Sequence, residues 1–243
     1  MDLIESPPGK VARHPWELAR AACILGLIEE RDFKTVADIG AGDLYFAREL
    51  LNRHRVSIMA LDTGYERVTQ MDGILRLTNL SDVADGSLDL AFLMDVLEHE
   101  QDDRRLLEEA LRKLAPRGHL LITVPAFEFL FSAHDVFLGH CRRYRRRQLH
   151  DLLRGLDVEL VQSFYFFASL FLLRCLQVLF AKSRLRTFGK GVSGWTFAQD
   201  HPMTRGLVAL LKADFALGRR LALSGIHLPG LSICQIIRKK SAS

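Results

Sequence analysis

The sequence predicts an α/β protein in which a mostly parallel sheet carries helices on both faces. Two observations lead to this prediction: short apolar runs alternate with helical segments through the first 125 residues, and several of these runs are apolar throughout. Continuous apolar runs are typical of parallel strands buried on both faces, and strand–helix alternation is typical of sheets covered on both sides. Such sheets bind ligands outside the carboxyl ends of their strands, so the residues that follow each strand are the functional candidates.

The expected elements follow one another regularly in the first half of the chain. A first helix is expected at 15–30, where Trp16 and Leu27 fall on one apolar stripe. Strands are expected at 35–39, 56–61, 74–78, 88–94 and 119–124. Further helices are expected at 44–52 and 102–115. The second of these begins with acidic residues, which favour a helix N-terminus, and it ends at Pro116.

The alternation weakens after Pro125. Here we expect a helix at 145–155, a strand at 158–164, a helix near 204–223 and a last strand at 231–240. The segment 166–228 is then an apolar, basic helical insertion, either a lid or a membrane-facing cap. Residues 1–165 and 229–243 together would form the main domain.

Charge and aromatic residues are distributed unequally along the chain. Residues 1–161 hold 21 Lys and Arg against 27 Asp and Glu, whereas residues 162–243 hold 12 against two. Of the 15 phenylalanines, 12 follow residue 126. This basic, apolar second half suits an anionic membrane surface or an anionic, lipid-like ligand. A hydrophobic subdomain with a solvated basic face is the alternative, and composition leaves both open.

The segment 164–181 is strongly apolar but is interrupted by Arg174 and Gln177. A helix that spans a bilayer needs about 20 predominantly apolar residues, so we expect a helix that lies on the membrane surface instead. Basic residues flank it at Lys182, Arg184 and Arg186. A buried helix that covers the active site or forms a dimer interface remains the alternative, and the sequence does not indicate an oligomeric state.

The four cysteines lie far apart and form no CxxC pair. Neither a disulfide scaffold nor a structural zinc site is therefore expected, and no other metal-ligand spacing is recognised. The first ten residues lack the apolar core of a signal peptide. We expect a cytoplasmic protein, with peripheral attachment to the inner face of the membrane as an open alternative.

Two glycines follow the first expected strand in the segment VADIGAGD, residues 36–43. Gly40 and Gly42 allow a sharp turn and a close approach of the backbone to a ligand. A dinucleotide site would carry a third glycine where Tyr45 stands, so this class of site is not supported. Asp62 ends the next strand, and its carboxylate can accept hydrogen bonds from two vicinal ribose hydroxyls. The spacing of the two motifs indicates a nucleoside held across the first two strand ends.

Four segments in order resemble the class I S-adenosylmethionine-dependent methyltransferases: VADIGAGD, LDTG, SLDLAFLMDVLEH and LAPRGHLLITVP. The resemblance covers residues 12–163 and 229–239 and is greatest for the ubiquinone-type and type 11 branch. It implies a Rossmann-like, mostly parallel sheet of seven strands. It also implies an enzyme that uses S-adenosyl-L-methionine to methylate an oxygen or nitrogen of a small acceptor, for which a lipid-linked or prenylated molecule is one candidate class.

The resemblance also implies the cofactor contacts. Gly40 and Gly42 would pass under the methionine portion, and Asp38 would support the loop or the methionine amino group. Asp62 would bind the ribose. The remaining contacts would be Asn79 and Leu80 beside the adenine and Asp95 on the floor of the site.

Methyl transfer needs an aligned nucleophile and, for an oxygen or nitrogen, a group that accepts a proton. His134 is the first candidate because Asp135 follows it and could orient it. His99 is the second candidate, since it follows the fourth expected strand in VLEH. Either histidine could instead hold a loop in place, and His140 is expected to anchor a turn.

Five arginines stand in the six residues 142–147, around Tyr144. They could recognise a phosphate or an anionic headgroup, or they could form a solvated helix entry. Nucleic acid is not an expected partner, because no aromatic platform accompanies them. Two other functions stay open: aminopropyl transfer, against which the basic second half argues, and cofactor binding or scaffolding without turnover.

Overall fold

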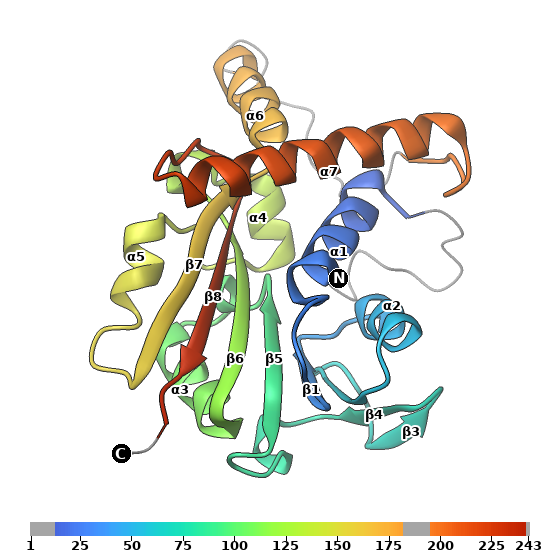
Figure 1. Cartoon of the computed structure of the whole chain (residues 1–243). Helices are drawn as coiled ribbons and strands as arrows, with labels where there is room; N and C mark the ends of the chain where they lie inside the picture. Colours follow the sequence, from blue (N-terminus) through green and yellow to red (C-terminus); the bar gives the residue numbers. More distant parts are fainter. Residues whose placement is uncertain (1–12, 182–194, 242–243) are drawn as a thin grey trace.

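The structure is a computed structural model that describes residues 13–181 and 195–241. Within these residues, eight strands form one sheet in the order β3-β4-β2-β1-β5-β6-β8-β7 (Figure 1). The strands are β1 (Thr35–Ile39), β2 (Ser57–Leu61), β3 (Thr69–Met71), β4 (Ile74–Leu77), β5 (Leu88–Met94), β6 (Leu114–Pro125), β7 (Val158–Phe166) and β8 (Ser232–Lys239). Of these, β3 and β8 run antiparallel to their neighbours, so the prediction of a mostly parallel sheet is confirmed.

The sheet has one strand more than the seven expected. The additional strand is β3, which pairs with β4 as a short hairpin at the edge of the sheet. Asp72 and Gly73 form its turn with φ of 53° and 80°, a geometry typical of tight two-residue hairpin turns. A polar strand of three residues carries too little apolar alternation to be recognised in a sequence, which is why this element was missed.

The helices are α1 (Pro15–Ile28), α2 (Tyr45–Arg53), α3 (Asp103–Lys113), α4 (Ala133–Leu138), α5 (Arg146–Asp151), α6 (Ala168–Ala181) and α7 (Pro202–Leu223), with short 3-10 helices η1 (Leu80–Asp82), η2 (Leu97–His99) and η3 (Glu128–Leu130). The start of α1 follows from its first residues, because the His14 side chain accepts a hydrogen bond from the backbone of Trp16 and Pro15 occupies the first turn. The helix α4 was not predicted. It has six residues, which is too short for a periodic pattern, and it ends at Gly139 in the left-handed conformation.

Two apolar layers enclose the sheet. On one face α1, α2 and α7 pack through buried residues such as Ile24, Leu50 and Phe215. On the other face α3 and α5 pack through Leu107 and Leu149. Helices on both faces confirm the predicted architecture.

The helices of the predicted insertion lie at one end of the sheet. Figure 1 shows α7 running across this end, with α6 rising above it. The helix α7 packs against α1 and β7, and α6 packs against α7 and η3. Among the described residues, no helix combines the length and the apolar character needed to cross a membrane.

Candidate functional site

A cavity of about 990 Å³ opens at the carboxyl ends of the central parallel strands. Residues that follow four of these strands line it: Gly40 after β1, Asp62 after β2, Asn79 after β4 and Asp95 after β5. This is the end of the sheet at which the sequence predicted a ligand.

The structure brings most of the predicted site residues to this cavity. The residues on its wall are Gly40, Asp62, Asn79, Leu80, Asp95, His99 and His134. Asp38 lines a small hollow beside it, and Gly40 borders both spaces. Gly42 is buried behind Asp62, to which its backbone N–H donates a hydrogen bond of 2.8 Å.

Gly40 is required by its own geometry. It adopts φ +78°, and a Cβ atom built there would lie 2.4 Å from Cγ2 of Val96. Its backbone N–H donates to the carbonyl of Leu61 at 2.8 Å. The chain can therefore turn at the end of β1 only because residue 40 has no side chain.

Asp62 holds two turns at once. Its Oδ2 accepts the N–H of Gly42 and its Oδ1 accepts the N–H of Gly64, each at 2.8 Å. Each carboxylate oxygen can accept a further hydrogen bond. The carboxylate is therefore fixed in place and still able to accept hydroxyl donors from the cavity.

Asp38 is 1 % exposed, and its Oδ2 has no hydrogen-bond partner among the described residues. Burial is the largest effect on this carboxyl and raises its pKa to about 6. A buried carboxylate oxygen without a partner is costly, so this atom is suited to a donor that a ligand supplies.

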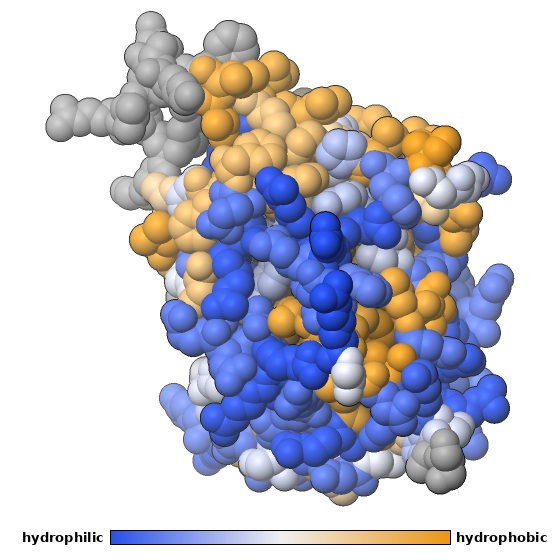
Figure 2. Space-filling view, turned by 90° about the vertical axis from the view of Figure 1, so that its left-hand side faces the viewer, coloured by the Kyte–Doolittle hydropathy of each residue, from blue (hydrophilic) through white to orange (hydrophobic). Residues whose placement is uncertain are grey.

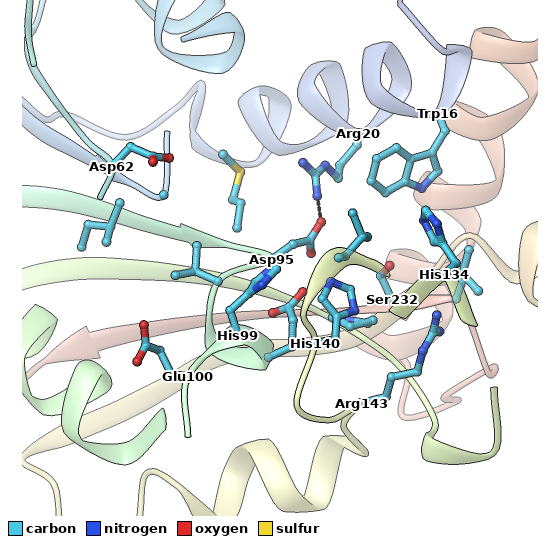
Figure 3. Close-up of a pocket in the computed structure, with 18 of the residues that line it drawn as sticks. Trp16, Arg20, Asp62, Asp95, His99, Glu100, His134, His140, Arg143 and Ser232 are labelled. Carbon is cyan, nitrogen blue, oxygen red and sulfur yellow. Dashed lines mark ion pairs between the residues drawn. The ribbon is translucent and has the colours of Figure 1, made fainter. Parts of the chain in front are cut away.

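The helix α1 closes the cavity from the side opposite the strands. Arg20 on this helix forms an ion pair with Asp95, drawn as the dashed line in Figure 3. The guanidinium also lies over the ring of Trp16, 4.6 Å from its centroid. Asp95 in turn accepts the hydroxyl of Thr123 at 3.0 Å. The sequence placed Trp16 in the first expected helix but did not indicate Arg20, because nothing in the local pattern separates it from a solvated arginine.

On the opposite side of the cavity, Asp135 contacts His140 and Arg143 instead of the His134 that the sequence suggested as its partner. Its carboxylate binds Arg143 through Nε at 2.7 Å and Nη2 at 3.0 Å, and contacts Nδ1 of His140 at 3.0 Å. The backbone and hydroxyl of Ser132 donate to it as well. Burial opposes ionisation of Asp135, but the hydrogen bonds from His140 and Arg143 outweigh burial and hold its pKa below the usual range. The expected pairing of Asp135 with His134 is therefore replaced by a network around His140 and Arg143.

Three of the five clustered arginines make internal contacts. Arg142 binds Asp103 at 3.0 Å, Arg143 binds Asp135, and Nε of Arg146 donates to the hydroxyl of Ser163 at 3.1 Å. Most of this cluster therefore holds the segment after β6 against the body of the protein. These three side chains are therefore not a solvated helix entry, and recognition of a phosphate or an anionic headgroup stays a prediction.

Glu98 is a further charged residue of the cavity wall that the sequence did not indicate. It is fully buried, and neither carboxyl oxygen has a hydrogen-bond partner among the described residues. Burial raises the pKa of Glu98 to about 8. The rings of His99 and His140 lie beside it, edge to face with centroids 4.7 Å apart. Glu98 stands in the connection between β5 and α3, residues 95–102, which holds three other acids, so no local signal separates it from a solvated carboxylate.

The helix α6 forms the outer wall of the cavity. It contributes Leu170, Leu173, Arg174 and Gln177. Arg174 donates to Gln177 at 3.2 Å, and burial is the largest cause that lowers the pKa of its guanidinium. This wall is mainly apolar and carries one cation.

A model of the methyltransferase domain family matches residues 17–163, which is more than half of the chain. No curated protein matches the sequence. Among solved structures, the [4+2]-cyclase SpnF is 19% identical with a TM-score of 0.56, over 98% of this chain and 86% of that one. Phosphoethanolamine N-methyltransferase 2 from Haemonchus contortus is 16% identical with a TM-score of 0.53, over 96% of this chain and 55% of that one.

These structural similarities establish the fold, and the cyclase illustrates that the fold alone does not define a reaction. The activity follows from the match to the methyltransferase domain family over residues 17–163. Together with the cavity at the ends of β1, β2, β4 and β5, it shows that this chain belongs to the class I S-adenosylmethionine-dependent methyltransferases.

Proposed function

We propose that this enzyme methylates an oxygen or nitrogen of a lipid-like acceptor that enters the cavity from the apolar surface of α6. One observation carries the proposal: the helix α6 belongs both to the wall of the cavity and to the exposed apolar surface. It lines the cavity through Leu170 and Leu173, and Leu173 together with Leu172, Leu176 and Leu179 on the same helix is at least 50% exposed.

The exposed leucines of α6 belong to a wider apolar surface. Figure 2 shows apolar residues gathered at the upper end of the molecule, where Figure 1 places α6 and α7. Its further members on η3, α4 and α7 are Phe129, Val136, Phe137, Met203, Leu207, Leu210 and Leu217. A surface of this kind on a basic half of the chain suits peripheral attachment to an anionic bilayer. The expected basic flank at Lys182, Arg184 and Arg186 lies outside the described residues.

The cofactor half of the cavity fits S-adenosylmethionine, which the Haemonchus contortus enzyme binds in its structure. The unpartnered oxygen of Asp38 suits the ammonium of the methionine portion, under which the backbone of Gly40 and Gly42 would pass. Asp62 can accept the ribose hydroxyls. The contacts proposed for the adenine and for the floor of the site are Asn79, Leu80 and Asp95.

The bound cofactor supplies a methyl group on an already activated sulfonium. The chain itself must orient the acceptor and receive its proton. His134 lines the cavity, and Figure 3 shows it at the same end of the cavity as Trp16, so we assign it the role of accepting the acceptor's proton. His99 is the second candidate for a catalytic role, next to Glu98 on the cavity floor.

Flotation with liposomes tests the membrane part of the proposal. The full chain should float with anionic vesicles, float less with neutral ones, and be only partly released by high salt, because apolar insertion persists when charges are screened. Substituting Leu172, Leu176 and Leu179 by Ser should abolish flotation. Leu160→Ser, at an exposed leucine of β7, serves as the control and should have no effect. A monodisperse protein that floats under none of these conditions would contradict membrane attachment.

The acceptor class is tested separately. Purified enzyme and cofactor labelled in its methyl group are incubated with the lipid extract and with the aqueous extract of cells that lack the enzyme. Label should enter the lipid fraction. Label found in the aqueous fraction alone would show that the acceptor is a water-soluble small molecule.

A further inference from the structure

A buried acid and two imidazoles meet on the acceptor side of the cavity. Glu98 comes from η2, His99 follows it directly, and His140 lies 41 residues later, after α4. One ligand atom from each residue lies within 4.8 Å of the others. All three residues line the cavity, and Figure 3 shows His99 and His140 on the same side of it.

The charge of Glu98 is only partly compensated inside the protein, because Arg20 and Arg143 favour its ionisation but burial outweighs them. Glu98 is 0 % exposed, and within residues 13–181 and 195–241 neither of its carboxyl oxygens accepts a hydrogen bond. A buried carboxylate of this kind normally has a paired cation or a metal ion. The guanidinium groups of Arg20 and Arg143 are the nearby cations, and these are bound to Asp95 and Asp135.

His140 is already held in the orientation that a metal ligand needs. Its Nδ1 lies 3.0 Å from Asp135, which leaves Nε2 as the ring nitrogen that can coordinate. Ligating histidines usually contact a carboxylate through their second nitrogen, which fixes the ring and raises its basicity. Asp135 is itself fixed by Arg143 and Ser132.

We propose that Glu98, His99 and His140 bind a divalent transition-metal cation, with Asp135 orienting His140. Two imidazoles and one carboxylate are a ligand set that suits Zn²⁺, and three protein ligands leave a coordination position open. All three ligand residues line the cavity, so an acceptor in the cavity could occupy that position. A cation there would bind an oxygen of the acceptor and lower the pKa of a hydroxyl, so the proposal favours an oxygen over a nitrogen acceptor. It does not depend on whether the acceptor is a lipid.

Zinc binding to the full chain tests the proposal without any acceptor. After treatment with a chelator, the protein is titrated calorimetrically with Zn²⁺, and bound metal is measured after dialysis. Wild type should bind one equivalent. Glu98→Gln and His140→Gln should each weaken binding by at least 100-fold, and Asp135→Asn should weaken it 10–100-fold, the range for partners that orient a ligand. Co²⁺ substituted for zinc should give a visible spectrum that changes in Glu98→Gln.

Two control variants distinguish zinc binding at this site from nonspecific binding of zinc to other side chains. Glu100→Gln removes an exposed carboxylate of the same cavity, and Cys141→Ser removes a thiol that contacts the carbonyl of His99. Both should bind zinc as wild type does. Loss of zinc in Cys141→Ser, unchanged affinity in a folded Glu98→Gln, or no stoichiometric binding by wild type would each overturn the proposal. Cofactor affinity measured on the same variants shows whether the methyltransferase site is intact, so failure of the metal site and failure of the proposed function are distinguishable.

Discussion

Two buried aspartates, one beside each half of the cavity, differ in what surrounds them. Asp38 at the cofactor half has an oxygen with no partner among the described residues, and its pKa is raised to about 6, chiefly by burial. Asp135 at the acceptor half is equally buried, but Arg143, His140 and Ser132 satisfy it, and its pKa is lowered.

This difference distinguishes a carboxylate that can bind a ligand, Asp38, from a carboxylate that holds the fold together, Asp135. The surroundings of Asp135 already compensate its charge, so it stabilises the fold. One oxygen of Asp38 accepts no hydrogen bond from the part of the chain that the structure describes, so a ligand that brings a donor would gain from it. Burial alone does not distinguish the two roles, whereas the number of satisfied oxygens does.

The largest expected effect is on stability at the acceptor half. Asp135→Ala should lower the free energy of unfolding by about 3–5 kcal/mol, because it leaves the buried guanidinium of Arg143 without its partner. Urea denaturation at pH 7 measures this change. Asp82→Ala, at an exposed residue of η1, is the control and should change it by less than about 0.5 kcal/mol. A loss of similar size in both variants would remove the distinction between the two aspartates.

The pH dependence of stability should have opposite signs at the two residues. The folded pKa of Asp38 lies above the ordinary 3.8, so the unfolded state releases its proton first and stability falls as pH rises from 3.8 to about 6. The total effect is about 3 kcal/mol, at about 1.4 kcal/mol per pH unit. The folded pKa of Asp135 is lowered, so its contribution is present above 3.8 and is lost as pH falls below that value.

Denaturation curves of the protein without cofactor, measured from pH 3 to pH 8, test this contrast. Asp38→Asn should reduce the fall between pH 3.8 and 6 and leave the acid limb unchanged, whereas the fall that the raised pKa of Glu98 adds above pH 4.5 should remain. Asp135→Asn should weaken the acid limb instead. Curves for wild type and Asp38→Asn that stay parallel across the whole range would show that Asp38 ionises normally.

A smaller effect is expected on the affinity for the cofactor. Asp62→Ala should weaken the binding of S-adenosylmethionine by about 1.5–3 kcal/mol, the range for hydrogen bonds to a charged group. Calorimetry at pH 7 provides the measurement. Because Asp62 also accepts the N–H groups of Gly42 and Gly64, Asp62→Asn should retain part of the loop contacts and lose less affinity. Unchanged affinity in a folded Asp62→Ala would exclude this carboxylate from the cofactor site.

The smallest effect should come from a single partner of Asp135. Ser132→Ala removes one hydroxyl from this carboxylate and from the N-terminus of α4, and should cost about 1 kcal/mol of stability. The contacts with Arg143 and His140 remain, which is why the loss is small. A loss as large as that in Asp135→Ala would mean that the network fails as a unit rather than partner by partner.

The sequence by itself was sufficient to predict the sheet, the helices on both faces and the edge of the sheet at which the cavity opens. Parallel strands end at the same edge of a sheet, so Gly40, Asp62, Asn79 and Asp95 had to lie together once their strands were recognised. Apolar periodicity encodes this information locally. The short elements β3 and α4 were not predicted, because segments of three and six residues are too short to show a periodic apolar pattern.

Only the tertiary structure showed which side chains contact one another on the other side of the cavity, around Asp135. The partner of Asp135 is His140, five residues away and past the end of α4, rather than the adjacent His134 that the sequence suggested. Arg20 reaches Asp95 across 75 positions, and α6 meets the cavity through one face only. Which carboxylate meets which cation depends on distances between elements far apart in the chain, and no local pattern of hydrophobic and polar residues specifies such distances.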